Sequence, residues 1–248
     1  MSLGVRASIK RREPSSSRHF RDSPLGQLMT DFAAARHNMV ESQVRINSVT
    51  DRRVIDALSA IPRERFVPQS SQGIAYMDED VRIAGGKPPR FLMEPRVFAK
   101  MVQLAEIGPE DLVLDVGCGT GYSTAVLARL AGTVVALECD ENLAASAGAT
   151  LSDLGVDNAA VLPGALTEGC AKQAPYDVIF INGMIGSVPD ALQNQLRDGG
   201  RLVAVVGDGI SGRARLYVRS GETFSGRDAF DANIGFLPGF EPVESFVF

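Results

Sequence analysis

The sequence predicts an α/β fold in which helices cover both faces of a mostly parallel β-sheet. Short apolar runs, typical of buried parallel strands, alternate with segments of helical periodicity between Leu112 and Val206. Glycines at positions 117, 119 and 121 join the first of these strands directly to a helical segment. An acidic residue, Glu138, ends the second strand. Regular alternation of strand and helix is the pattern of a sheet with crossover helices.

The length and composition fit one domain with appendages. The chain has 248 residues, of which 45% are hydrophobic and 22% are charged, and these values are ordinary for a globular protein. No apolar run approaches the ~18 residues that a membrane span needs. The first 22 residues lack the apolar core of a signal peptide. We therefore expect neither a membrane span nor a secretory signal.

Charge is distributed unevenly along the chain. Residues 1–22 carry six basic and two acidic side chains, a balance of +4, whereas the whole chain has a net charge of −5. The remainder therefore carries −9, which argues against a nucleic-acid-binding body. The cysteines (118, 139 and 170) and the two histidines, His19 and His37, match no metal-binding spacing. We expect free thiols in a reducing compartment and no metal site.

The N-terminal part divides into a tail and a helical cap. Residues 1–26 are basic and serine-rich, and we expect a disordered tail, with a transit peptide or an electrostatic docking arm as alternatives. Residues 27–248 are expected to form the folded domain, with a cap and a loop over 27–94 and the core over 95–248. Within the cap, helices are predicted over Leu28–Ile46 and from Thr50, which can cap the helix, to Pro62, which ends it.

The core elements follow in order. Strands are predicted over Leu112–Val116, Thr133–Leu137, Ala159–Leu162, 174–182 and Arg201–Val206, with Ala214–Val218 and Val243–Phe248 as edge or antiparallel strands. Helices are predicted from Pro95 to Gly108, from near Thr120 past Leu130, from Asp140 to Gly155 and over Val188–Leu196. The loop before Pro95 should lie at the carboxyl ends of the strands, where ligands bind in such sheets.

The glycine turn has the chemistry of a nucleoside site. Glycines at a spacing of two let the backbone turn tightly and let a ligand lie against bare main chain. The helix that opens near Thr120 points unpaired N–H groups at the same place. Glu138 stands where an acid binds a ribose diol, seventeen residues after Gly121. We therefore expect the main chain between Asp115 and Tyr122, opposite the Glu138 carboxyl, to bind a nucleoside.

The run Asp115-Val-Gly-Cys-Gly-Thr-Gly121 resembles the first motif of class I S-adenosylmethionine (SAM) methyltransferases, with Glu138 as the ribose acid. The dehydrogenase fingerprint places its third glycine one residue later, so the spacing favours SAM. The resemblance implies a Rossmann-like sheet of seven strands, the last antiparallel, and SAM as the cofactor. The expected cofactor-binding residues are Asp115, Gly117, Cys118, Gly119, Gly121, Tyr122, Glu138, Cys139, Ala165, Leu166 and Asn182.

Upstream runs narrow the resemblance to one family. Met39-Val-Glu-Ser-Gln-Val44, Val54-Ile-Asp-Ala-Leu58, Pro62-Arg-Glu-Arg-Phe-Val-Pro68 and Ala75-Tyr-Met-Asp78 occur in the order seen in protein-L-isoaspartate O-methyltransferases. The resemblance extends from about Met39 to about Val206. It implies methylation of the carboxylate of L-isoaspartyl residues in damaged proteins and peptides, a cytoplasmic repair reaction. It leaves the oligomeric state open.

The loop before Pro95 departs from that family. Aligned on Pro95, Phe91 takes the position of the family threonine, Met93 that of the serine and Glu94 that of the glutamine. Met93 cannot donate a hydrogen bond to a substrate carboxylate, and Glu94 would repel it if ionised. The catalytic residues therefore stay unknown, with Arg90, Met93 and Glu94 as candidates. The basic residues that could replace the lost donor are Lys87, Arg90 and Arg96.

A second departure is Ala165, which stands where the family has an aspartate that accepts from the adenine amino group. Losing a charge-assisted hydrogen bond of this kind costs on the order of 1.5–3 kcal/mol.

Two alternative functions stay open. One is a SAM-dependent methyltransferase whose acceptor fits the divergent loop over residues 90–94. The other is a degenerate methyltransferase that acts as a binding or regulatory protein through its basic tail.

Overall fold

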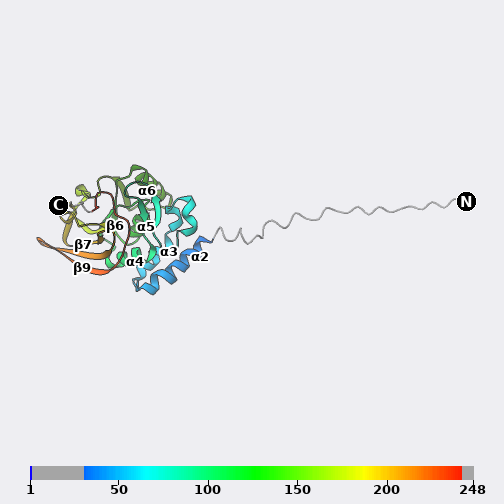
Figure 1. Ribbon diagram of the computed structural model, residues 1–248, viewed down its shortest axis with the longest axis horizontal. Coiled ribbons are helices and arrows are strands. Elements are labelled where there is room, and N and C mark those ends of the chain that lie inside the picture. Colours follow the sequence, from blue (N-terminus) through cyan, green and yellow to red (C-terminus); the bar gives the residue numbers. More distant parts are fainter. Residues whose placement is uncertain (2–30, 242–248) are drawn as a thin grey trace. The chain divides into compact units, whose positions relative to one another are not determined.

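Seven strands form one sheet in the order β5-β4-β3-β6-β7-β8-β9. Figure 1 labels β6, β7 and β9 among them. The computed structural model describes residue 1 and residues 31–241, and the residues from Ala33 onward form the compact unit considered below. The strands are β3 (Leu112–Val116), β4 (Thr133–Glu138), β5 (Ala159–Pro163), β6 (Tyr176–Ile185), β7 (Leu196–Gly207), β8 (Gly212–Ser220) and β9 (Thr223–Asp231). Strands β3 to β7 pair in parallel, β8 pairs antiparallel with β7, and β9 antiparallel with β8. The predicted seven-stranded, mostly parallel α/β sheet is confirmed.

Helices cover both faces of this sheet. The core helices are α4 (Pro95–Leu104), α5 (Tyr122–Ala128), α6 (Glu141–Asp153) and α7 (Asp190–Gln193). Asp115 of β3 points to the face covered by α5, where the hydroxyls of Ser123 and Thr124 each donate to its Oδ2 at 2.7 Å. Successive strand residues point to opposite faces, and the next residue, Val116, belongs to a buried cluster with Leu192 of α7 on the other face.

A cap of helices precedes the sheet. It consists of α2 (Phe32–Met39), a π-helical turn (Val40–Val44), α3 (Arg52–Ala60) and three 3-10 segments (Arg45–Asn47, Arg63–Phe66 and Gln69–Ile74). The sequence predicted Thr50 as the N-cap of α3, but in the structure the N-cap is Asp51. Asp51 Oδ1 accepts from the N–H of Arg53 at 2.8 Å, while the N–H of Thr50 donates to Gln103 Oε1 at 2.6 Å. This bond to α4 holds Thr50 outside the helix.

Two short strands, β1 (Val81–Ala84) and β2 (Arg90–Leu92), form an antiparallel ribbon that links the cap to the core. β2 leads into α4, where Pro95 lies in the first turn as predicted. The helix ends at Leu104, earlier than the predicted end at Gly108. Glu106 adopts a positive φ of 48°, which takes the chain out of helical geometry before the glycine is reached.

Other boundaries also differ from the prediction. β6 runs through Asn182 to Ile185, because its last residues pair with Val205 and Val206 of β7. α7 is shorter than predicted, since Leu196 already begins β7. The sequence does not predict β9, whose residues are mostly exposed and therefore lack apolar alternation. The predicted tail over residues 1–26, the predicted helix start at Leu28 and the predicted strand over 243–248 lie outside the described residues, apart from Met1.

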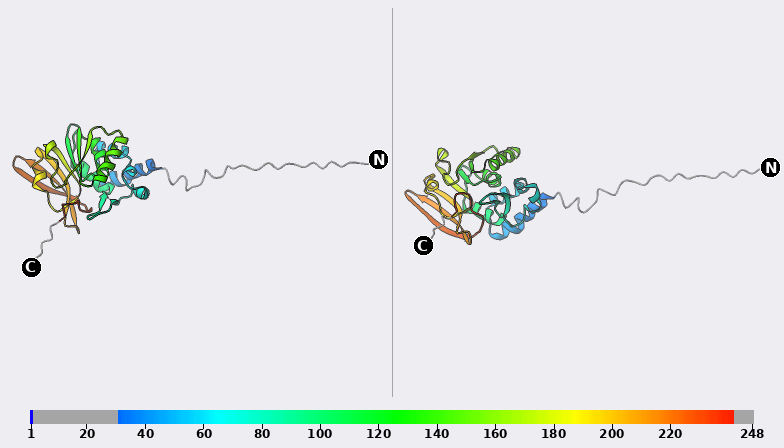
Figure 2. Two further views of the ribbon diagram at one scale, coloured as in Figure 1. Left: turned by 90° about the horizontal axis from the view of Figure 1, so that it is seen from above. Right: turned by 45° about the horizontal axis from the view of Figure 1, so that its top comes forward.

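In both views of Figure 2, strands β7 to β9 (yellow to orange) extend away from the helices of the cap (blue to cyan). The carboxyl ends of β3 and β4 carry the glycine turn and Glu138, so they form the edge at which the site is described below. Within residues 31–241, no helix combines the length and apolarity that a membrane crossing requires.

Candidate functional site

The glycine turn lies against the end of β4. Gly117, Gly119 and Gly121 all have positive φ angles, of 76°, 57° and 94°, which residues other than glycine rarely adopt. The N–H of Gly117 donates to the carbonyl of Leu137 at 2.8 Å. Gly121 is the N-cap of α5, so the first turn of that helix starts directly from the turn. The local sequence thus places the glycine turn at the carboxyl edge of the sheet, as predicted.

Glu138 lies beside this turn and is fully buried. Its Oε2 accepts from the N–H of Gly119 at 2.7 Å, and its Oε1 accepts from the N–H groups of Cys139 and Asp140 at 2.9 and 3.1 Å. These three main-chain donors fix the carboxylate at the mouth of the turn. The predicted neighbourhood of the turn and the acid is therefore present.

Arg90 of β2 forms an ion pair with the same carboxylate. Its Nη1 donates to Glu138 Oε1 at 2.5 Å and its Nη2 to Oε2 at 2.8 Å, a bidentate pair, while Nη2 also donates to the carbonyl of Gly117 at 3.2 Å. The Arg90 side chain is only 6% exposed. Burial alone would raise the pKa of Glu138, but Arg90 and the main-chain N–H groups outweigh burial and hold that pKa below its ordinary value.

Asp115 leaves one buried carboxylate oxygen for an added donor. Oδ2 accepts from Ser123 and Thr124, whereas Oδ1 has no hydrogen-bond partner among residues 31–241. Burial raises the pKa of Asp115 to about 6, although the two hydroxyl donors act in the opposite direction. A buried polar atom without a partner is costly, and a donor from a bound ligand or water would supply the missing bond.

The other predicted cofactor residues differ in their position and burial. Asn182 lies at the turn, where its Nδ2 donates to Ser123 Oγ at 3.0 Å and to the carbonyl of Gly117 at 3.4 Å. Tyr122 is buried in the core, with its ring against Phe66 and Phe98. Cys118 and Leu166 are buried, whereas Cys139 and Ala165 are exposed. The structure thus brings Asp115, Asn182 and Glu138 together around the turn.

Apolar side chains also lie on the glycines. A Cβ atom on Gly117 would lie 2.8 Å from Cδ2 of Leu237, one on Gly183 would lie 2.6 Å from Cγ of Leu237, and one on Gly119 would lie 2.7 Å from Cδ1 of Ile83. The expected bare seat is therefore covered by side chains in this structure. Sequence reasoning missed Leu237, which follows the last strand and carries no motif.

The main chain of the divergent loop accepts a hydrogen bond from a buried arginine. Arg63, from the Pro62–Pro68 run, is fully buried and donates from Nη2 to the carbonyl of Met93 and from Nε to the carbonyl of Ala75, both at 2.6 Å. The Met93 side chain is 1% exposed. Glu94 donates its N–H to Asp80 Oδ1 at 2.8 Å. Burial raises the pKa of Asp80 to about 6.

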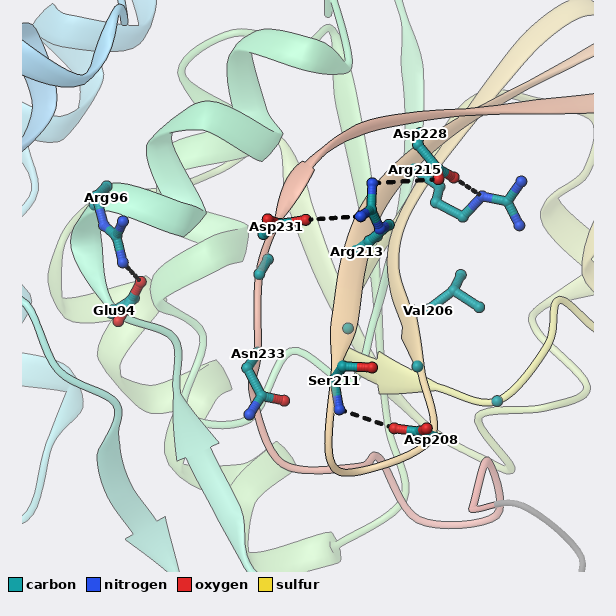
Figure 3. Close-up of a pocket in the computed structure, with 14 residues that line it drawn as sticks. Glu94, Arg96, Val206, Asp208, Ser211, Arg213, Arg215, Asp228, Asp231 and Asn233 are labelled. Carbon is teal, nitrogen blue, oxygen red and sulfur yellow. Dashed lines mark hydrogen bonds and ion pairs between the residues drawn. The ribbon is translucent and has the colours of Figure 1, made fainter.

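A cavity of about 920 Å³ lies between the start of α4 and the strands β7 to β9 (Figure 3). Glu94 and Arg96 line its α4 side, and Arg96 Nη2 donates to Glu94 Oε1 at 2.7 Å. Charged pairs line the strand side, including Arg215 Nε to Asp228 Oδ1 at 2.8 Å. The cavity joins the divergent loop to a strongly polar surface. In the described part of the chain, no His, Cys, Asp or Glu side chains gather as a metal-ligand group.

Comparison with known proteins agrees with this geometry. The protein-family description "Protein-L-isoaspartate(D-aspartate) O-methyltransferase (PCMT)" matches residues 34–238. A protein-L-isoaspartate O-methyltransferase from Koribacter versatilis is 41% identical over 179 residues, which cover 72% of this chain and 79% of the relative.

Two solved structures share the fold. One, named protein-L-isoaspartate O-methyltransferase, superposes with a TM-score of 0.73 at 24% identity and covers 83% of this chain and 67% of its own. The other, described as such an enzyme from Plasmodium falciparum in complex with S-adenosyl-L-homocysteine, superposes with a TM-score of 0.67 at 17% identity, covering 83% and 97%. The match over residues 34–238 and the identity to the Koribacter relative place this chain in the protein-L-isoaspartate(D-aspartate) O-methyltransferase family.

Proposed function

We propose that this protein transfers a methyl group from SAM to the carboxylate of isoaspartyl residues in proteins and peptides, in the cytoplasm. The observation that carries the proposal is the family match, because it spans the cap, the divergent loop, the glycine turn and the strands that follow. The named activity of the 41% identical relative supports the same reaction. The arrangement of Asp115, the glycine turn and Glu138 supplies the physical basis.

The residues at the turn are of the kind that holds SAM. Glu138 can accept from a ribose diol once Arg90 has left its two oxygens, and Asp115 Oδ1 has a free place for an ammonium donor. The glycines leave room for a ligand when Leu237 and Ile83 move aside. Ala165 offers no side-chain acceptor to adenine, so the base would depend on main-chain groups and apolar packing.

The acceptor carboxylate would lie in the cavity beside the divergent loop. Methyl transfer to an ionised carboxylate needs little acid–base chemistry, so the protein contributes mainly by holding the nucleophile in line with the methyl group that SAM supplies. Met93 is buried, and Arg90 already binds Glu138. Arg96, the second residue of α4, lines the cavity and is also paired, with Glu94 and Asp78, but its side chain is 43% exposed, so it is the basic residue best placed to meet an anionic acceptor.

An assay of methyl transfer from radiolabelled SAM to an isoaspartyl peptide, with the matching aspartyl peptide as the control, tests the function. We expect transfer to the isoaspartyl peptide alone. Glu138→Gln should weaken SAM binding by about tenfold or more in isothermal titration, because the amide cannot accept both ribose hydroxyls as a carboxylate does. Glu141→Gln, on the exposed first turn of α6, is the matched control. SAM binding without transfer to either peptide would identify a methyltransferase with a different acceptor.

A further inference from the structure

Glu138 already has its full set of hydrogen-bond donors. Five N–H groups reach its two oxygens, three from the main chain of Gly119, Cys139 and Asp140 and two from Arg90. A carboxylate offers about four lone-pair positions. A ribose diol would bring two more donors to the same oxygens. The main-chain donors belong to the fold itself, so only the two guanidinium donors can be exchanged.

A second closure lies on the glycine side of the same site. Leu237 is 3% exposed and packs on Gly117 and Gly183. Main-chain bonds to β6 hold it there, since the N–H of Leu237 donates to the carbonyl of Met184 at 3.0 Å and the N–H of Met184 donates to the carbonyl of Gly235 at 3.1 Å. The segment that carries Leu237 is therefore attached to the sheet like an additional short strand.

The two closures contact each other. A Cβ atom on Gly235 would lie 2.9 Å from Cδ2 of Phe91, the residue next to Arg90 in β2. Movement of β2 that withdraws Arg90 from Glu138 therefore also disturbs the segment that positions Leu237. This contact joins the strand that carries Arg90 to the segment that carries Leu237.

We propose that Arg90 and Leu237 together keep the adenosyl site closed in the free protein, and that SAM binds by replacing the Arg90 guanidinium on Glu138 with its ribose hydroxyls. The inference rests on the proposed function, because it assumes the same cofactor site. The measured affinity for the cofactor is then the intrinsic affinity reduced by the fraction of molecules in the open state. Removing the closure raises that fraction and tightens binding without any new contact to the ligand.

Titration of S-adenosyl-L-homocysteine into the full chain tests the proposal. Arg90→Met keeps the length of the side chain but removes the two donors, and Arg82→Met is the matched control on the exposed side of the neighbouring strand β1. We expect the dissociation constant to fall about tenfold in Arg90→Met, as for a tenfold rise in the open fraction. The constant should stay within about twofold of wild type in Arg82→Met.

Leu237→Ala is the second variant and tests the apolar closure, with a smaller gain of about threefold expected. Unchanged or weaker binding in a folded Arg90→Met protein, as judged by circular dichroism and thermal melting, overturns the proposal. If Arg90→Met does not fold, unchanged or weaker binding in Leu237→Ala overturns it instead.

The proposed function is scored separately, by peptide methylation. If the wild-type protein methylates the peptide and both variants bind with unaltered affinity, the proposed function is supported and the proposed closure is contradicted. If Arg90→Met binds more tightly and no variant methylates the peptide, the closure is supported and the function is contradicted.

Discussion

Asp115 is a buried residue with one carboxylate oxygen that has no hydrogen-bond partner among residues 31–241, and its raised pKa of about 6 has a consequence for ligand binding. Above that pH the carboxylate is ionised and can hold an ammonium group, whereas below it the protonated acid cannot. We expect the affinity for S-adenosyl-L-homocysteine to fall about tenfold between pH 7.5 and pH 5, in proportion to the ionised fraction of Asp115. Titration calorimetry between pH 5 and pH 7.5 measures it. A flat profile in the wild type, or a sloping one in Asp115→Asn, would contradict this role.

Met93 tests the alignment of the divergent loop. A serine hydroxyl at this position could donate to the substrate carboxylate, which a thioether cannot do. We expect Met93→Ser to raise the rate of isoaspartyl methylation while it lowers the melting temperature, because a side chain that is 1% exposed is replaced by a smaller, polar one. Met77→Ser, at a half-exposed methionine of the cap, is the control. No gain in rate at a temperature where the variant is folded would show that another residue faces the acceptor.

The individual residues also show what the sequence can predict of the site. The glycines and Glu138 are close in sequence to their strands, and parallel neighbours end at one edge, so their meeting follows from pattern alone. The partner of Glu138 does not follow, because Arg90 lies 48 residues away on a ribbon whose position depends on tertiary packing. Leu237 is an ordinary leucine without a motif, and its contact with Gly117 is visible only in three dimensions.

At the level of elements, the N-caps give a direct test of local energetics. Asp51 accepts from the N–H of Arg53 and starts α3. We expect Asp51→Ala to lower the free energy of unfolding by about 1 kcal/mol, the usual effect of removing such a cap. Asp56→Ala, on the exposed face in the middle of the same helix, should cost nothing by comparison because alanine favours helix interiors. Chemical denaturation measures both, and equal losses in the two variants would show that Asp51 acts only as a surface charge.

The strands and helices that the sequence predicts are those whose patterns are local. β3 and β4 are buried apolar runs, and β5 is a partly exposed apolar run. α4 and α6 have Pro95 and Asp140 at their N-termini, so the starting residues of these elements are predicted closely. β9 is not predicted, because a strand with little burial has no apolar periodicity and is defined by pairing with β8. β6 is buried throughout, and it extends beyond Asn182 because its last residues pair with β7. Pairing between distant segments is what sequence periodicity does not contain.

At the level of the whole molecule, cofactor binding should appear as stability. A ligand that binds only the folded protein adds about 2.7 kcal/mol of unfolding free energy at a concentration of 100 Kd. For a chain of this size, we expect S-adenosyl-L-homocysteine to raise the melting temperature by about 5–10 °C at that concentration. Differential scanning calorimetry measures the shift, with adenine as the control ligand. The absence of any shift at millimolar ligand would contradict the cofactor assignment.

The order of the chain gives the Leu237 contact a further meaning. Arg90, the glycine turn, Glu138 and Asn182 precede β9, and Leu237 follows it. Proteins are synthesised from the N-terminus, and domains form as their segments emerge. The ribosome therefore releases the sheet, the turn and the acid before it releases the residue that covers them. A nascent chain that stops at Asp231 lacks Leu237, and with it the side chain that packs on Gly117 and Gly183, whereas Arg90 and Ile83 are already present.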